Sequence, residues 1–221
     1  MMIEWNGGRR SAAPRLPVGN GSLVTIPWNI LDGSTGDGTC DYYHRFKSDI
    51  QLMVDLSIDA YRMSISWSRL CPDGTGAINQ AGVAFYNSVI NELIYRGIEP
   101  YVTLYHWDMP LHLENDPQLK GWRTKGIITH FVYFAETCFK LFGDRVKNWV
   151  TFNEVAMFAV NGYGYGIHAP GRCSALSGTK KNVYTGDSST EPYFVAHMAL
   201  LSHTAVVRFT GRNFNLNKRV V

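Results

Sequence analysis

Short, mostly apolar stretches alternate with longer amphipathic stretches along most of the chain. Three of the short ones are rich in β-branched and aromatic residues and are bounded by polar or turn residues: Ala60–Trp67, Glu99–Tyr105 and Lys147–Glu154. Stretches of this kind predict buried β-strands. Between them, apolar residues recur every three or four positions with charges in the gaps, which predicts amphipathic helices.

The helical stretches can be placed by this spacing. Phe46, Ile50, Met53 and Leu56 predict the first helix. The next two run from Val83 to Ile94 and from Ile127 to Phe142, and a glycine follows each of them. A fourth helix is predicted to start at Ser189-Thr190-Glu191-Pro192, where a capping residue, an early proline and an acidic first turn occur together.

Alternating helices and strands indicate parallel βα units and therefore an α/β fold. A closed (β/α)8 barrel needs eight strands in about 250 residues. The chain offers three clear strands, with a further one possible at Leu23–Ile26, and is expected to form about the first half of a barrel. We expect a poorly ordered lead-in over 1–24, the half-barrel over 25–209 and a separate tail over 210–221.

Polar residues gather where the predicted strands end. Arg62 lies within the first strand, His106-Trp107-Asp108 follows the second, and Asn153-Glu154 ends the third. The carboxyl ends of parallel strands carry the chemistry in such folds. An amide, an imidazole, a guanidinium and an indole around one opening suit a polyhydroxylated substrate, because polar groups bind hydroxyls while the indole stacks on an apolar sugar face.

Each of these residues also has a purely structural interpretation. His106 could be a hydrogen-bonded core histidine and Trp107 an ordinary core residue. Arg62 could be an ion-pair partner of Asp59 or Asp108, because buried charges are usually paired. Asn153 and Glu154 could be a capping pair between a strand and a helix.

Sugar hydrolysis requires two carboxylates, roughly 5–5.5 Å apart in a retaining enzyme. The carboxylates available to pair with Glu154 are Asp108, Asp187 and Glu191, and no argument from sequence makes any of them face it. The second catalytic carboxylate is therefore predicted to be absent. The run Gly162–Ile167 lacks the features of a phosphate loop and is expected to be a mobile loop.

Charge, cysteine spacing and hydropathy exclude several classes of function. The formal charge is +3, and no basic stripe crosses the folded part, so nucleic acid is not an expected partner. The four cysteines show no Cys-x-x-Cys pair and no histidines at metal-ligand spacing, so no metal or other cofactor is expected. No signal-peptide core and no bilayer-spanning stretch is visible. As it stands, the chain is expected to be cytoplasmic and away from membranes.

Several long motifs resemble glycoside hydrolase family 1, and in particular its plant β-glucosidases. They are Ala60–Arg69, Ile98–Asp108, Thr151–Glu154, Ala169–Ser174 and Ser189–Tyr193, which occur in the family's order. The resemblance covers about residues 28–209. It implies a TIM barrel that hydrolyses terminal non-reducing β-D-glucosyl residues with retention of configuration, without a cofactor.

The resemblance also implies roles for single residues. Glu154, a carboxyl at a partly buried strand end, would be the general acid/base. His106 and Asn153 would hydrogen-bond the non-reducing sugar, and Trp107 would line that subsite. Arg62 would keep the carboxylate of the nucleophile ionised. The substrate would be a β-glucoside or an oligosaccharide.

The chain departs from the family pattern in several places. The family's nucleophile, a glutamate late in the barrel, has no counterpart, and no first strand with a sugar-binding glutamine precedes Trp28. Val155 stands where proline is usual. Plant members often have a second cysteine soon after Cys173, but Ala175–Tyr184 has none, and Thr210–Val221 does not resemble the family.

These departures lead to three expectations about activity. The first is a β-glucosidase by family that is truncated before its nucleophile and inactive alone. The second is a non-catalytic sugar-binding remnant, and the third is a half-barrel that assembles with a complementary half. Open barrel edges make self-association an expected property. Family members are often secreted, vacuolar or plastid proteins, so the motifs do not fix a compartment.

Overall fold

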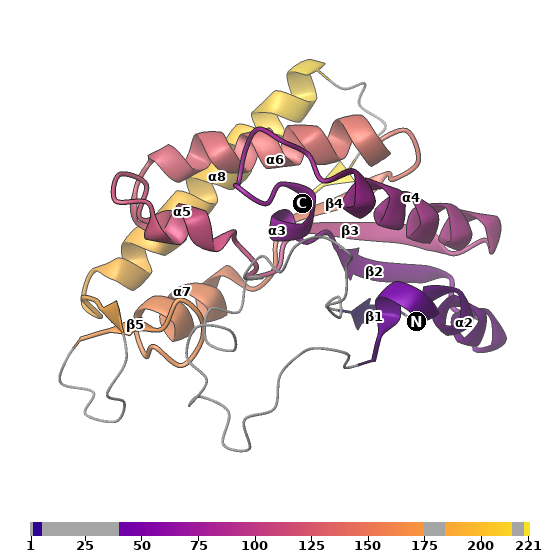
Figure 1. The fold of residues 1–221 in the computed structure, drawn as a ribbon, viewed down its shortest axis with the longest axis horizontal. Helices are drawn as coiled ribbons and strands as arrows, with labels where there is room; N and C mark the ends of the chain where they lie inside the picture. Colours follow the sequence, from indigo (N-terminus) through magenta and orange to yellow (C-terminus); the bar gives the residue numbers. More distant parts are fainter. Residues whose placement is uncertain (1, 6–39, 175–183, 214–218) are drawn as a thin grey trace.

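The computed structural model describes residues 2–5, 40–174, 184–213 and 219–221 (Figure 1). A parallel sheet has the order β1 (Met2–Trp5), β2 (Ala60–Ser64), β3 (Glu99–Tyr105), β4 (Asn148–Phe152) and β7 (Arg219–Val220). The main helices are α2 (Tyr42–Asp55), α4 (Gln80–Tyr95), α6 (Gly126–Phe142) and α8 (Glu191–Asn213). The α/β alternation predicted from the hydrophobic pattern is confirmed, and the sheet of the described residues is open.

Shorter elements fill the connections. They are α3 (Trp67–Leu70), α5 (Leu111–Asn115), the 3-10 helix η2 (Gly121–Arg123), α7 (Val155–Tyr163) and the strand pair β5 (Arg172–Cys173) and β6 (Tyr184–Thr185). The prediction of a loop over Gly162–Ile167 is wrong at its start, because Gly162 and Tyr163 close α7. Gly162 allows a close approach, since a Cβ there would lie 2.8 Å from the Ala169 carbonyl oxygen.

Both ends of the chain contribute to the sheet. Met2–Trp5, within the stretch expected to be a poorly ordered lead-in, pairs in parallel with β2. Within the predicted tail, Thr210–Asn213 complete α8, and the Val221 N–H donates to the Trp149 carbonyl oxygen at 2.9 Å. These strands are too short for a periodic signal, which is why the sequence did not predict them. The strand considered at Leu23–Ile26 lies outside the described residues.

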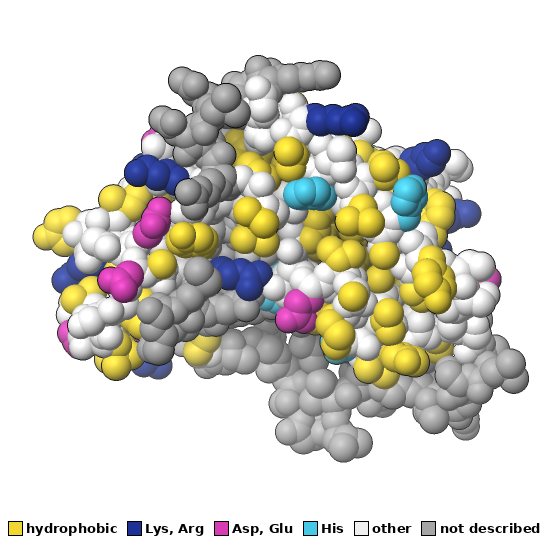
Figure 2. Space-filling model, turned by 180° about the vertical axis from the view of Figure 1, so that it is seen from behind, with side chains coloured by type: hydrophobic (Ala, Val, Ile, Leu, Met, Phe, Trp, Pro, Cys, Tyr) yellow, Lys and Arg dark blue, Asp and Glu magenta, His cyan; other side chains and the backbone are white. Residues whose placement is uncertain are grey.

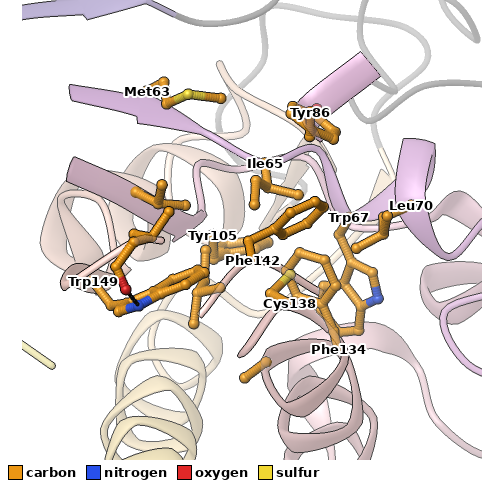
Figure 3. Packing of buried hydrophobic residues seen from close by; sticks show 14 of the residues in the cluster. Met63, Ile65, Trp67, Leu70, Tyr86, Tyr105, Phe134, Cys138, Phe142 and Trp149 are labelled. Atoms are coloured by element: carbon orange, nitrogen blue, oxygen red, sulfur yellow. Dashed lines mark hydrogen bonds between the residues drawn. The ribbon is translucent and has the colours of Figure 1, made fainter. Parts of the chain in front are cut away.

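The core is built from large aromatic side chains between the sheet and the helices (Figure 3). Trp67 is fully buried and stacks on Phe134, with ring centroids 5.1 Å apart and planes 11° from parallel. Its indole N–H donates to the Gly74 carbonyl oxygen at 3.0 Å. A buried indole with its polar atom satisfied fixes the β2–α3 corner firmly. This corner lies next to the end of β3.

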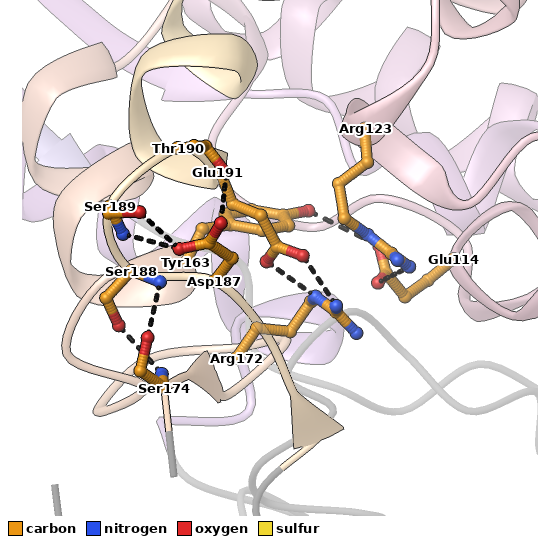
Figure 4. A network of polar contacts seen from close by, with 10 residues as sticks. All are labelled: Glu114, Arg123, Tyr163, Arg172, Ser174, Asp187, Ser188, Ser189, Thr190 and Glu191. Atoms are coloured by element: carbon orange, nitrogen blue, oxygen red, sulfur yellow. Dashed lines mark hydrogen bonds and ion pairs between the residues drawn. The ribbon is translucent and has the colours of Figure 1, made fainter. Parts of the chain in front are cut away.

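A buried polar network joins the connections at the carboxyl end of the sheet (Figure 4). Arg123 donates to Glu114 at 2.8 Å, and the Tyr163 hydroxyl lies 3.3 Å from the same carboxylate. Arg172 makes two hydrogen bonds to Glu191, at 2.8 and 2.6 Å. Burial raises the pKa of Glu114, and the charge of Arg123 counters part of this rise. Glu114 therefore joins α5 to η2 and α7, and the Arg172–Glu191 pair joins β5 to α8.

The segment between β5 and β6 is held at its base by hydrogen bonds. The Ser174 N–H donates to Ser188 Oγ at 2.8 Å, and the Ser188 N–H donates to Ser174 Oγ at 2.9 Å. The Gly186 N–H donates to the Cys173 carbonyl oxygen at 2.9 Å. Cys173 itself is a buried free thiol. Hydrogen bonds thus hold together the two ends of this segment, where plant relatives were expected to use a second cysteine. Residues 175–183 are not described.

Candidate active site

Three predicted site residues are connected by hydrogen bonds although they come from three different strands. Arg62 of β2 donates from Nη2 to Asn153 Oδ1 at 2.7 Å. The Trp107 indole N–H, after β3, donates to the Asn153 carbonyl oxygen at 2.9 Å. Asn153 is buried, whereas Arg62 and Trp107 are half-buried. The strand ends therefore converge as the sequence predicted, with Asn153 at the centre.

The end of β3 presents two aromatic side chains. His106 and Trp107 are both half-buried, with ring centroids 5.8 Å apart. Trp107 also packs against His168, with ring centroids 5.2 Å apart. The Trp107 backbone has a φ of 68°, in the left-handed region that costs a bulky residue about 1–3 kcal/mol. Trp107 is half-buried and packs against the margin of the core, so part of its side chain is exposed to solvent.

Glu154 occupies the junction between β4 and α7. Its φ of 40° and ψ of 62° are left-handed, and this conformation turns the chain from strand directly into helix. The residue stands at the N-cap position, but its side chain makes no capping hydrogen bond. We expected a partly buried carboxyl, and the residue is exposed. The left-handed residue stands two positions beyond the end of β4 and directly before α7.

Thr103 is a site residue that the motifs did not single out. It is fully buried in β3 and accepts a hydrogen bond from Arg62 Nε at 3.0 Å. Arg62 is in register with Tyr101, so Thr103, two residues on, is its diagonal neighbour on the same face. A polar residue in the middle of an apolar strand, next to a strand that carries a cation, was the signal available in the sequence. Thr103 and Asn153 together fix the guanidinium of Arg62.

Replacing Thr103 tests this arrangement. Thr103→Val keeps the shape but removes the acceptor of a charged donor, so we expect a loss of about 2 kcal/mol in the free energy of unfolding. Thr103→Ser retains the hydroxyl and is the matched control. Urea denaturation of both variants measures the difference. Equal destabilisation by valine and serine would show that packing, not the hydrogen bond to Arg62, matters at this position.

Asp108 has a buried carboxyl group next to the site. Its Oδ2 accepts the backbone N–H of Trp67 at 3.1 Å, and its buried Oδ1 has no hydrogen-bond partner among the described residues. Burial raises the pKa of Asp108 to about 6, and the Ser66 hydroxyl and nearby backbone N–H groups counter part of this rise. The residue is therefore protonated more readily in the folded protein than in the unfolded chain.

This raised pKa predicts a dependence of stability on pH. A carboxyl whose folded-state pKa lies above its ordinary value of 3.8 favours the folded state most at low pH, and this contribution is lost as the pH rises through about 6. Asp108→Asn removes the ionisation. Its free energy of unfolding, relative to the unsubstituted protein, should therefore rise by about 2 kcal/mol between about pH 4 and pH 7. Urea titrations at several pH values measure this, and a constant difference would contradict it.

The carboxylates considered as partners of Glu154 are engaged elsewhere. Glu191 is paired with Arg172. Asp187 accepts from the Ser189 and Thr190 hydroxyls at 2.6 and 2.8 Å, which lowers the pKa of Asp187. Asp108 is bonded to Trp67. The part of the chain that the structure describes thus presents one exposed candidate acid beside an amide, an imidazole and a guanidinium.

Among the residues with described positions, no three His, Cys, Asp or Glu side chains are grouped as a metal site would require. No helix within them is both long enough and apolar enough to cross a bilayer.

A parallel α/β sheet with polar residues at successive strand ends is the arrangement of barrel enzymes. The family profile described as Glycosyl hydrolase family 1 matches residues 19–218, and the chain belongs to this family. The match reaches beyond the range 28–209 that the motifs covered. It includes part of the segment expected to be an unrelated tail.

Relatives and solved structures agree with this assignment. The chain is 52% identical over 195 residues to Beta-glucosidase 25 of Oryza sativa subsp. japonica, covering 87% of this chain and 38% of that protein. It is 51% identical over 177 residues to Beta-glucosidase 40 of Arabidopsis thaliana, covering 80% and 34%. The chain therefore spans about a third of the length of these relatives.

Among solved structures, a rice β-glucosidase mutant in a covalent complex with Glc superposes with a TM-score of 0.88 at 42% identity, covering 99% of this chain and 46% of that one. A family 1 β-glucosidase from Thermotoga maritima gives a TM-score of 0.78 at 38% identity, covering 90% and 41%. The sheet described here is thus part of a family 1 TIM barrel, as the fold prediction stated.

Proposed function

We propose that this chain supplies the acid/base part of a retaining β-glucosidase site, with Glu154 as the proton donor. The observation that carries the proposal is the hydrogen-bonded set of Arg62, Asn153 and Trp107 directly beside the exposed Glu154. Related proteins that are named β-glucosidases supply the substrate class, which is a terminal β-D-glucosyl residue.

The orientation of Asn153 favours a hydrogen bond to a sugar hydroxyl. Its Oδ1 accepts from Arg62, and arginine can only donate, so the amide oxygen is assigned without ambiguity. The two Nδ2 hydrogens then remain to donate to a substrate oxygen. His106 and Trp107, at the neighbouring strand end, would bind a second hydroxyl and an apolar sugar face.

Glu154 would act twice in the reaction. It would first donate a proton to the glycosidic oxygen as the bond to the leaving group breaks, and then remove a proton from the water that hydrolyses the glycosyl intermediate. Formation of that intermediate needs a second carboxylate roughly 5–5.5 Å away. The carboxylates of the described residues that we considered have other partners, so we propose that the 221-residue polypeptide binds sugar but does not hydrolyse glucosides alone.

Binding of an iminosugar tests the sugar-binding part. Deoxynojirimycin is the ligand in a complex of the Thermotoga maritima enzyme. Calorimetry should detect its binding to the 221-residue polypeptide, with His106→Ala abolishing the heat and His44→Ala, an exposed histidine of α2, leaving it unchanged. Binding that survives in His106→Ala would contradict the site. Turnover of a nitrophenyl β-D-glucoside by the polypeptide alone would contradict the claim that the second carboxylate is missing.

We also propose that the isolated polypeptide associates with a second copy. Tyr193, Leu200 and Val207 repeat every seven residues along α8 and are 77%, 59% and 38% exposed. Met157 and Val160 of the adjacent α7 are exposed as well. Hydrophobic side chains are spread widely over the face seen from behind (Figure 2). Exposed apolar surface of this kind favours association.

Sedimentation across a range of protein concentrations measures this association. We expect oligomers that dissociate when Leu200 is replaced by Lys, because the charge would have to be buried in the contact. Leu52→Lys, on the exposed side of α2, is the matched control. A monomer at all concentrations would contradict the proposal.

A further inference from the structure

Asp108 connects two parts of the molecule that meet at the candidate sugar site. It follows Trp107 at the end of β3, and its Oδ2 accepts the Trp67 backbone N–H at 3.1 Å. Trp67 is fully buried, and its indole is stacked on Phe134 and bonded to the Gly74 carbonyl oxygen. The carboxylate of Asp108 is thus attached to a rigid point of the core.

Trp107 lies between this attachment and the end of β4. Its backbone is left-handed, with a φ of 68°, and its indole N–H donates to the Asn153 carbonyl oxygen at 2.9 Å. A strained backbone persists only where the surroundings hold it in place. Two of these restraints are the Asp108 bond on one side and the Asn153 bond on the other.

We propose that Asp108 is a positioning residue, whose carboxylate holds the end of β3 against the β2–α3 corner and so fixes the Trp107 indole over Asn153. An ionised carboxylate accepts a backbone N–H more strongly than a protonated one. Loss of its charge should therefore loosen the end of β3, including His106 and Trp107. The consequence for sugar binding rests on the proposed function, whereas the positioning itself does not.

The groups around Asp108 allow its charge to change near neutral pH. Tyr86 of α4, Tyr105 of β3 and Cys138 of α6 surround it, and burial raises the pKa of each. They remain neutral over the range in which Asp108 ionises. Within the described ranges, no ion pair includes Asp108. His106 and His168 lie against Trp107, and Glu114 lies near Tyr105, so a pH titration must separate their effects from that of Asp108.

Nuclear magnetic resonance on protein with isotope-labelled tryptophan tests the proposal directly. The chain has six tryptophans, so few signals need assignment. The Trp67 backbone N–H and the Trp107 indole N–H should shift together with one midpoint as the pH is lowered. The Trp149 indole N–H, bonded to the Val146 carbonyl oxygen, should not move with them. Asp108→Asn should abolish the shared shift.

A second variant keeps the test decisive if Asp108→Asn does not fold. The Ser66 hydroxyl helps to keep Asp108 ionised, so Ser66→Ala should move the shared midpoint to higher pH. The proposal would be overturned if the Trp107 indole N–H shifted with a different midpoint from the Trp67 backbone N–H. It would also be overturned if the shared shift persisted in Asp108→Asn. Failure of deoxynojirimycin to bind at any pH, with the shared shift intact, would refute the proposed function and leave the positioning role standing.

Discussion

A fusion of residues 1–221 to the C-terminal portion of Beta-glucosidase 25 from rice should hydrolyse a nitrophenyl β-D-glucoside, whereas the 221-residue polypeptide should not. The chain matches 38% of the length of that relative, and the fusion supplies the rest of the barrel. Retaining hydrolysis needs both carboxylates in one site, so activity should depend on joining the two parts. Release of nitrophenol, followed by absorbance, is the measurement.

The control is the same fusion with Leu52→Lys, a change of an exposed side chain in α2, which should keep its activity. Equal turnover by the fusion and by the isolated polypeptide would contradict the view that the second carboxylate lies outside these residues. A folded fusion without any turnover would contradict the assignment of the acid/base part to this chain.

Gly121→Ala should be the most destabilising single methyl addition in the polar network. Gly121 has a φ of 56°, and a Cβ there would overlap Glu114 Oε2 and lie 2.8 Å from the Met109 methyl. Glu114 is buried and paired with Arg123 at 2.8 Å, so displacing it would break a buried ion pair. We expect a loss of about 4 kcal/mol in the free energy of unfolding, mostly from the unpaired charge.

Gly76→Ala is the matched control for this substitution. Gly76 also has a positive φ, 83°, but nothing lies within 4 Å of the position its Cβ would take. It should therefore show only the backbone strain, about 1 kcal/mol. Urea denaturation of both variants gives the difference between them. Similar losses in Gly76→Ala and Gly121→Ala would mean that the Glu114 pair contributes little to stability.

The larger elements of the fold were predictable because their signals span many residues. The strand Glu99–Tyr105 has the predicted bounds, and the predicted helix from Ile127 to Phe142 matches α6 within one residue at its start. By contrast, α7 was read partly as a loop because its last turn contains Gly162. Glycine is a weak local signal, and here it serves a tertiary contact with Ala169.

The sequence predicted which residues form the candidate site more fully than it predicted how they are arranged. Arg62, Asn153 and Trp107 were expected to meet, because parallel strand ends meet at one edge of a sheet, and their hydrogen bonds show that they do. The hydrogen bond from Arg62 to Thr103 could not be inferred without the register of β2 and β3. Neither the exposure of Glu154 nor its left-handed backbone could be predicted from composition or spacing.

The central claim is that Glu154 is the acid/base residue of a two-carboxylate site. Glu154→Gln in the active fusion tests it most directly, using two substrates that differ only in their leaving group. Cleavage of a nitrophenyl glucoside should fall by at least about a hundredfold, because the leaving oxygen needs a proton. Cleavage of a dinitrophenyl glucoside should be restored by azide with formation of β-glucosyl azide, because neither step then needs the acid/base. Equal loss on both substrates without rescue by azide would contradict this role for Glu154.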